Sequence, residues 1–446
     1  MPGIAHRWLV LACIACVCAC VCACGGGDDA PSDARGGPGG SSKDAGQPSS
    51  SEGAACEANK AKCAEFGDER PSRSSEHAAA YDPESGEMIV FGGTNSVPEK
   101  CALGGPVHFL DETWIYSDPC RGWLRVQAPG PSATGRHMAA WGDGNVWVFG
   151  GRFREQESTG AYELYDDLFR FDVAARSWHE VEVAGERPSP RVNGALVWDS
   201  KREQLWLFGG NESTSGASYA PLADVWSFDP NEGRWTLHEP SGRAPAARLF
   251  HAALYDAQRD GMVIFGGADA SAFSGSASYF RDVWALSLPE LQWVQLHPGG
   301  SGAPEGRFWA GLVHDDSRDA YLLFGGHDDQ MLGNRNDTWR FDPDDMGWEL
   351  LGAGDRLQGE ARDVCDFPPD FTAVELNAPE RRSAHSVVWS QPCKHALVFG
   401  GKTDCGAIDD VWSFDGKSWS NELAATEGES CLRWRDQPEQ CGDLCF

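Results

Sequence analysis

This sequence is poor in positive charge and carries no familiar catalytic signature. Its 446 residues include 37 Lys and Arg against 67 Asp and Glu, which gives a formal net charge of −30 at pH 7. A protein this acidic repels nucleic acid and anionic lipid headgroups, so we expect no nucleic-acid partner. We interpret the acidity as a means of keeping the domain soluble, and cations, polyamines or basic partners stay open. No residue pattern typical of a nucleophile triad, a phosphate-binding loop or a metal-spaced histidine pair occurs, so we predict no catalytic residue, cofactor or metal.

Cysteine is absent from the middle of the chain, between Arg121 and Val364. Six of the 16 cysteines lie within the first 24 residues, which leaves ten, four before the gap and six after it. An even number in an exported chain predicts disulfides. Zinc is the weaker alternative, because Cys441-x-x-x-Cys445 lacks a second half-site and export favours oxidation. The ten disulfide candidates are Cys56, Cys63, Cys101, Cys120, Cys365, Cys393, Cys405, Cys431, Cys441 and Cys445.

A hydrophobic run that ends in a glycine pair recurs six times. The intervals between the first glycines of successive pairs are 58, 59, 57, 59 and 75 residues. A period of this length indicates a repeat architecture. The pairs are Gly92-Gly93, Gly150-Gly151, Gly209-Gly210, Gly266-Gly267, Gly325-Gly326 and Gly400-Gly401.

The rest of each unit keeps the same order. A Pro-x-x-Arg step lies upstream, as at Arg248, and the residue three places later precedes the glycine pair by fifteen. In the second unit this residue, Ala139, precedes Gly150 by only eleven, and we attribute the shortening to a tight hairpin turn at Asp143-Gly144. Downstream come an acidic residue, an aromatic residue two places later and a second tryptophan. Each unit therefore predicts four short strands.

The second predicted strand of each unit is apolar on both faces. Met262–Phe265 and Tyr321–Phe324, for example, show no alternation of polar and apolar residues. A strand of this kind is covered on both sides, as it is when sheets stack face to face. One sheet alone could not bury such strands, so we predict that the six units pack against one another.

The glycine pair, the following aromatic and the spaced tryptophan resemble kelch repeats, and six such units resemble the six-bladed kelch β-propeller of bacterial kelch-repeat lipoproteins. The resemblance covers Glu76 to about Glu422. It implies an all-β fold with four antiparallel strands per blade, preceded by a disordered tether. It says little about function, because kelch propellers include enzymes, receptors and scaffolds.

The N-terminal segment predicts export. Trp8–Cys24 carries no charge, and Val21-Cys22-Ala23-Cys24 resembles a bacterial lipobox, which implies lipidation of Cys24. Cys20 is an alternative, as is an ordinary cleaved signal or an uncleaved anchor. We therefore expect a membrane-anchored lipoprotein of the cell envelope, at the outer membrane or the surface. The predicted parts are a signal peptide (1–23), a flexible lipid-anchored linker (24–55), a Cys-containing extension (56–75), the propeller (76–422) and a Cys-rich tail (423–446).

The joint between the first and last blades is predicted to need closure. Because the first unit begins with strand one and the sixth ends with strand four, no strand from one end completes a blade at the other. Disulfides at this seam could replace a shared strand, each contributing about 2–4 kcal/mol. We expect Cys101–Cys120 within blade one and pairing of tail cysteines across the seam.

One face of the predicted disc should collect the long loops after the glycine pairs. These loops mix Ser and Gly with aromatics such as Tyr219 and Tyr279, a composition typical of binding loops, although tolerated insertions look the same. The insertion Ala361–Leu376 should project from this face as a lid, a flap or a stapled loop.

Five arginines are predicted to stand at equivalent places near the axis. They could ring an acidic ligand, as in kelch propellers that read acidic motifs, or each could form an ion pair with an aspartate of its own blade. We favour the ion pairs, because repeats reuse one interface. His77, His251 and His385 also recur near the axis, too far apart to share a metal. The five are Arg136, Arg191, Arg248, Arg307 and Arg382.

Taken together, these patterns favour a monomeric, non-catalytic binding module of the cell envelope that presents its loop face to a protein, peptide or glycan. The resemblance leaves two alternatives open. One is a propeller enzyme, such as a sugar mutarotase or a copper oxidase, although only 8 tyrosines are available to build a copper site. The other is a structural scaffold of the envelope.

Overall fold

The computed structural model describes residues 56, 60–95, 108–155, 160–272, 274, 277, 279–328, 333–355, 377–403 and 406–426. The chain divides into two compact units, residues 1–47 and 48–446, and all described residues belong to the second. The predicted leader, the lipidation site at Cys24, the insertion 361–376 and most of the C-terminal tail lie outside the described residues. So do Cys101, Cys365, Cys405 and the three tail cysteines.

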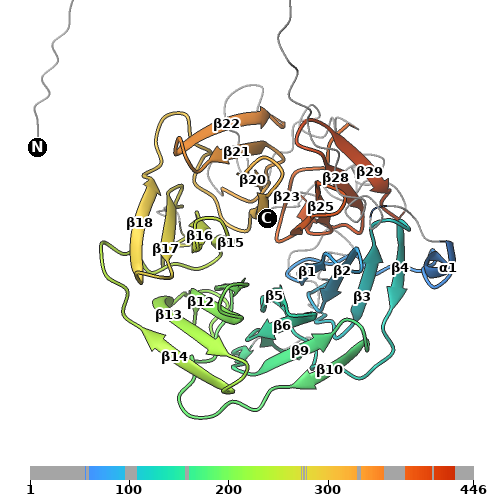
Figure 1. Ribbon diagram of the computed structural model, residues 1–446, viewed down its shortest axis with the longest axis horizontal. Coiled ribbons are helices and arrows are strands. Elements are labelled where there is room, and N and C mark those ends of the chain that lie inside the picture. Colours follow the sequence, from blue (N-terminus) through green and yellow to red (C-terminus); the bar gives the residue numbers. More distant parts are fainter. Residues whose placement is uncertain are drawn as a thin grey trace, which may run out of the picture. The chain divides into compact units, whose positions relative to one another are not determined.

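Six four-stranded antiparallel sheets circle one axis, as Figure 1 shows. From the innermost strand outward, the first three blades are β1 (Ala78–Asp82), β2 (Glu87–Phe91), β3 (Thr113–Ser117) and β4 (Gly122–Arg125); β5 (Met138–Gly142), β6 (Asn145–Phe149), β9 (Leu168–Asp172) and β10 (Ser177–Glu180); and β11 (Ala195–Asp199), β12 (Gln204–Asn211), β13 (Pro221–Asp229) and β14 (Arg234–His238).

The other three blades follow the same order. They are β15 (Ala252–Asp256), β16 (Gly261–Phe265), β17 (Val283–Ser287) and β18 (Gln292–His297); β19 (Gly311–Asp315), β20 (Ala320–Phe324), β21 (Thr338–Asp342) and β22 (Gly347–Gly352); and β24 (Ser386–Ser390), β25 (His395–Phe399), β28 (Val411–Phe414) and β29 (Trp419–Leu423). Short strands on the loops are β7 (Arg152–Phe153) with β8 (Glu163–Leu164), and β23 (Arg382–Ser383) with β26 (Lys402–Thr403) and β27 (Gly406–Ala407).

Each blade is built from one stretch of the chain, so the predicted six-bladed fold is confirmed, and among the described residues no strand is shared across the seam. The innermost strands contact one another in a closed ring, which includes contact of β1 with β24. In the described part of the chain the only helix is α1 (Lys60–Cys63), and no helix there is long and apolar enough to cross a membrane.

The apolar core lies between blades rather than within one sheet. Trp206 of β12 and Val225 of β13 pack with Met262 and Ile264 of β16 in the next blade, and all four are buried. This packing explains why strand two carries no polar face, as predicted. The second tryptophan of each unit lies on the outermost strand, as Trp293 does on β18, and covers the outer part of this core.

The turn residues confirm the register at two places. Asp143 and Gly144 have φ of 52° and 70° and form the predicted two-residue hairpin between β5 and β6. Gly266, the first glycine of its pair, has φ of +68°, and a Cβ there would lie 2.7 Å from the carbonyl oxygen of Arg307 in the next blade. Glycine is therefore required by both the backbone conformation and the close approach of the neighbouring blade.

Two disulfides attach the N-terminal extension to both sides of the seam. Cys63, in α1, pairs with Cys120 of blade one, and Cys56 pairs with Cys393 of blade six. The predicted pair Cys101–Cys120 is therefore wrong, because α1 brings Cys63 to the turn between β3 and β4. A disulfide does cross the seam, and its second cysteine comes from the extension that precedes the propeller.

The seam is packed like the other blade junctions. Tyr81, Met88 and Trp123 of blade one are buried against Leu397 and Phe399 of blade six. The extension therefore adds covalent closure to a joint that already has a continuous apolar core.

Candidate functional site

Six equivalent residues, one per blade, form a continuous ring of hydrogen bonds around the axis. Each has φ between 50° and 61°, and its N–H donates to the carbonyl oxygen of the equivalent residue in the preceding blade at 2.8–3.3 Å. The ring closes at the seam, where blade one donates to blade six. We call this ring the axial belt: Glu76, Arg136, Asn193, Phe250, Trp309 and Ala384.

The axial belt lies on the loop face, the face that carries the links between blades and the loops between strands two and three. Each belt residue comes two positions before the innermost strand of its blade, so repetition of the fold delivers six side chains to one place. A left-handed conformation is unusual for residues other than glycine and is maintained here by the belt hydrogen bonds. The side chains differ from blade to blade, so the belt is a repeated frame that carries non-repeated chemistry.

Four of the five predicted arginines form ion pairs with an aspartate of their own blade. Each guanidinium binds both oxygens of an aspartate at 2.5–3.1 Å, and its Nη1 also donates to the carbonyl oxygen of the first glycine of the pair at 3.0–3.1 Å. Their side chains are at most 1% exposed. The pairs are Arg191–Asp224, Arg248–Asp282, Arg307–Asp337 and Arg382–Asp410.

These pairs lock strand three to the start of strand one. The indole of Trp339 donates to the carboxylate of Asp337, which Arg307 already binds, and the other three locks repeat this bond. Burial by itself would raise the pKa of Asp337, but Arg307 outweighs burial and the pKa is lowered. The ion-pair interpretation therefore describes these four arginines, and we remove them from the candidate ligand site.

Arg136 is not equivalent to the other four, so its predicted place was wrong. The carbonyl oxygen of Thr134 accepts the N–H of Gly93 at 2.8 Å. The same bond in the next blade joins Gly151 to the carbonyl oxygen of Arg191 at 3.0 Å, so Thr134 is the counterpart of Arg191. Arg136 lies two residues further on, in the axial belt. The hairpin at residues 143–144 accounts for only two of the four residues by which this unit is shortened.

The Arg136 side chain is held at the axis by charge and by aromatic rings. Its guanidinium donates to Glu76 at 2.7 Å and lies 4.8 Å from the ring centre of Trp309 and 5.6 Å from that of Phe250. The Glu76 carboxylate also contacts Arg152 at 3.3 Å. Burial alone would raise the pKa of Glu76, but the two arginines lower it to about 2, so the carboxylate is charged at neutral pH.

Arg152, the second arginine beside Glu76, adds a positive charge that no second carboxylate in this group balances. Burial and the neighbouring Arg136 lower the pKa of Arg152 to about 10, which still leaves it protonated at pH 7. Two guanidinium groups therefore face one carboxylate, a local surplus of one positive charge in a chain whose net charge is −30. Arg152 also lies 4.0 Å from the ring centre of Tyr162, which belongs to a loop of blade two.

The predicted tyrosines join the wall of this site at different depths. Tyr219 is half-buried beside Phe250, with ring centres 5.7 Å apart, and burial raises its pKa. Tyr279 lies further round the face, with its ring 5.0 Å from that of Phe308. Tyr162, an aromatic residue that was not among the predicted site residues, lies against Arg152 and is thus nearer the charged group than Tyr279.

The axial belt surrounds a cavity of about 140 Å³ on the loop face. One side is charged, with Glu76 and Arg136, and the other is aromatic, with Phe250 and Trp309. A small concave site with a few convergent polar groups on an apolar wall is typical of ligand pockets. We take this axial pocket as the candidate functional site.

Four buried histidines lie directly behind the axial belt. Each packs against the phenylalanine that ends strand two of the preceding blade, with ring centres 5.0–5.3 Å apart. Burial is the main cause that lowers the pKa of His77 to about 4 and those of His137 and His251 to about 3, and it holds the pKa of His385 well below its usual range. Sequence reasoning found three of the four and missed His137, because it aligned Ala139 instead.

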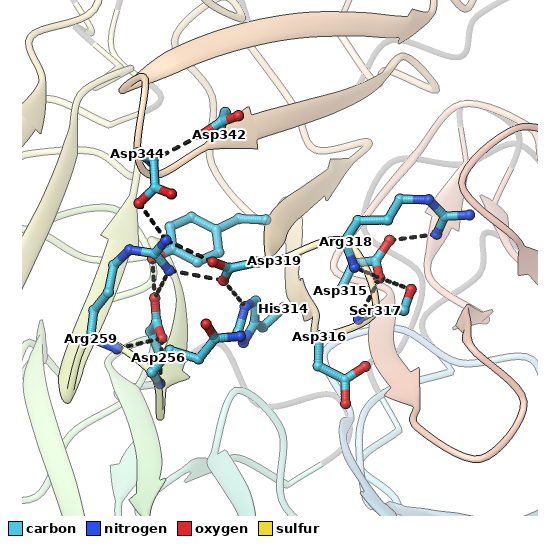
Figure 2. Close-up of polar contacts among 12 residues, drawn as sticks. Asp256, Arg259, His314, Asp315, Asp316, Ser317, Arg318, Asp319, Asp342 and Asp344 are labelled. Carbon is cyan, nitrogen blue, oxygen red and sulfur yellow. Dashed lines mark hydrogen bonds and ion pairs between the residues drawn. The ribbon is translucent and has the colours of Figure 1, made fainter. Parts of the chain in front are cut away.

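The described residues contain two groupings that could hold a metal ion, and neither includes these four histidines. One grouping is Asp256, His314 and Asp319, on the face opposite the loops, shown in Figure 2. There the guanidinium of Arg259 already binds Asp256 at 3.0 Å, Asp319 at 2.8 Å and Asp344 at 2.7 Å. Hydrogen bonds from Arg259 lower the pKa of Asp319 to about 2. This cluster is thus an ion-pair network between blades four and five.

Comparison with known proteins finds kelch-repeat proteins among the matches. A sequence model of the KLHDC2/KLHL20/DRC7 Kelch-repeats domain matches residues 157–363. Kelch domain-containing protein 10 of Mus musculus is 27% identical over 350 residues, which are 72% of this chain and 71% of that protein. The leucine-zipper-like transcriptional regulator 1 homolog of Drosophila melanogaster is 27% identical over 297 residues, 65% of this chain but only 27% of that relative.

A solved structure, entitled "Structure of YjhT", aligns with 79% of this chain and 99% of its own length, with a TM-score of 0.56 and 16% identity. At this identity the likeness concerns the fold alone. The chain also spans only part of several relatives, for example 7% of the flagellar outer-arm dynein alpha chain of Chlamydomonas reinhardtii.

Proposed function

The chain is a kelch-repeat β-propeller, and from this premise we propose that it is a non-catalytic binding module whose axial pocket receives an acidic group of a protein, peptide or glycan. The observation that carries the proposal is Arg136, which lines the pocket and is held against Trp309 and Phe250. A guanidinium with aromatic faces beside it is a common recognition surface for carboxylates.

The local charge favours an acidic ligand in spite of the acidic chain. At physiological ionic strength, charges more than about 8 Å away are largely screened, so the pocket's own charges dominate the field that a bound group feels. Arg136 and Arg152 together exceed Glu76 by one positive charge. Other acidic surfaces of the protein would repel the same ligand, which would concentrate binding at the axis.

The proposed localisation of this module depends on the N-terminal leader. The uncharged segment Trp8–Cys24 and its lipobox-like ending support export and lipidation at Cys24, and the Gly- and Ser-rich segment after it would let a monomeric propeller reach a partner from the membrane. Disulfides on both sides of the seam support an oxidising compartment.

Binding of defined probes tests the proposal. Fluorescent acidic peptides, neutral peptides of equal length, and neutral and anionic glycans would be titrated with the full chain and followed by anisotropy. We expect acidic probes to bind and Arg136→Gln to raise their Kd at least tenfold, since a hydrogen bond to a charged group contributes about 1.5–3 kcal/mol. Arg154→Gln is the matched control, because Arg154 lies on the same face outside the cavity lining, 4.3 Å from the ring of Tyr162.

Both variants must keep the melting temperature of the wild type. If no acidic probe binds, or if Arg136→Gln binds as tightly as the wild type, the axial pocket is not the recognition site. A sugar probe whose anomers interconvert faster in the presence of the protein would support the mutarotase alternative instead.

A further inference from the structure

The disulfide Cys56–Cys393 lies beside a polar cluster that bridges the seam. Asp118, just after β3 of blade one, has its carboxylate oxygens 3.0 and 3.1 Å from Nε2 of His395, the first residue of β25 in blade six. The hydroxyl of Ser390 donates to the same carboxylate at 2.6 Å. Two blades therefore meet here through side chains that are also common metal ligands.

The geometry brings three kinds of donor into one small volume. The carboxylate of Asp118, Sγ of Cys393 and a ring nitrogen of His395 all lie within 4.8 Å of one another. Sγ of Cys56 is bonded to that of Cys393, so a second sulfur occupies the same place. A tetrahedral zinc site with bonds of about 2.0–2.3 Å has donors about 3.3–3.8 Å apart, so small side-chain rotations would suffice.

We propose that Cys56, Cys393, His395 and Asp118 form an exchangeable closure site, which is a disulfide when oxidised and a Zn²⁺ centre when reduced. A dithiol reductant supplies two electrons and two protons, the S–S bond breaks to give two thiols, and the dithiol becomes a disulfide. Zn²⁺ then displaces both protons and forms two Zn–S bonds, one bond to the imidazole and one to the carboxylate. This ligand set, two thiolates with one imidazole and one carboxylate, suits Zn²⁺.

Either state would hold the ring shut. Cys56 belongs to the extension, Asp118 to blade one, and Cys393 and His395 to blade six, so a metal ion would join all three segments. Among the described residues the other disulfide, Cys63–Cys120, belongs to no such grouping of ligands. It therefore provides an internal control within the same molecule.

Alkylation mapping of the wild-type full chain tests the proposal. The protein is reduced with a phosphine and exposed to a maleimide with and without one equivalent of Zn²⁺, and each cysteine is quantified by peptide mass spectrometry. We expect Zn²⁺ to slow modification of Cys56 and Cys393 at least tenfold while Cys63 and Cys120 react at the same rate. Equal protection of both pairs, or no protection at all, overturns the proposal, including the case in which reduction unfolds the propeller.

A Co²⁺ titration of the reduced protein supplies a second readout. Wild-type protein should show thiolate-to-metal charge-transfer absorption and the visible d–d bands of tetrahedral Co²⁺, and His395→Gln should lose at least half of the d–d intensity. Cys120→Ser should keep the wild-type absorption, since that cysteine lies outside the site. An unchanged spectrum in His395→Gln, or an equal loss in Cys120→Ser, contradicts the site.

Discussion

The four histidines behind the axial belt should make the propeller sensitive to mild acid. Their folded-state pKa values are lowered, so the folded protein keeps them neutral while an unfolded chain protonates them near pH 6.5. The stability they permit is complete above pH 6.5. It falls as the pH drops from 6.5 toward the folded pKa of about 4 or below. The four are His77, His137, His251 and His385.

The size of the effect follows from linkage. One pH unit is equivalent to 1.36 kcal/mol per proton, so each histidine lowers the free energy of unfolding by about 2 kcal/mol between pH 7.5 and pH 5. Four would together remove about 8 kcal/mol, which is comparable to the whole stability of a typical domain. Carboxylates with lowered pKa, such as Glu76 at about 2, titrate mainly below this window, so the change between pH 5 and 6.5 comes mainly from histidines. His238 and His297, whose pKa values burial also lowers, add to the effect of the four.

Guanidinium unfolding at several pH values between 5 and 7.5 measures this dependence. His251→Ala should lose some stability at pH 7.5 because a buried ring is removed, but its disadvantage relative to wild type should shrink by about 2 kcal/mol at pH 5. Alanine is compatible with this position, because Ala310 occupies it in blade five. His179→Ala, on the exposed strand β10, is the control, because it takes no ring out of the interior. If His251→Ala follows the same pH dependence as wild type, the reasoning is refuted.

Three further outcomes are expected. Arg307→Ala should lower the free energy of unfolding by about 3–5 kcal/mol in chemical denaturation, since it removes both guanidinium hydrogen bonds from the buried carboxylate of Asp337, and a loss below 1 kcal/mol would contradict the lock. Gly266→Ala should destabilise the fold more than Gly185→Ala, because both have positive φ but a Cβ at Gly185 meets no atom within 4 Å; equal melting temperatures would count against the contact. Non-reducing peptide mapping should recover a peptide linked through Cys56–Cys393, and absence of that peptide would refute the covalent seam. Cys393→Ser should lower the free energy of unfolding of the oxidised protein by about 2–4 kcal/mol.

Regular features of the repeat were predictable from spacing. Local chemistry explains both the features that recur, which are the glycine pairs and runs such as Met262–Phe265, and the shorter hairpin at Asp143-Gly144. The structure confirms the strands that these features predict. The ion pair of Arg307 was also predictable, because a residue repeated at one position in several units usually serves the interface that the units share.

The site was harder to predict, because it depends on what differs between units. Arg136 was assigned to the arginine position because it is the nearest arginine to the proline step, although Thr134 holds that place. The signal that could have corrected the register was numerical: a two-residue hairpin shortens a unit by two residues, not four. With that correction, His137 would have aligned with His251, and Arg136 with Phe250.

The sequence by itself determined the six blades, their strand order and the need for glycine where neighbouring blades touch, since these follow from local patterns repeated along the chain. Only the tertiary structure decided that Glu76, Arg136 and Trp309 share one pocket and that Cys56 reaches Cys393. The physical reason is that closing the ring brings together residues from different units, up to 337 positions apart in the disulfide, and no periodicity encodes such a meeting.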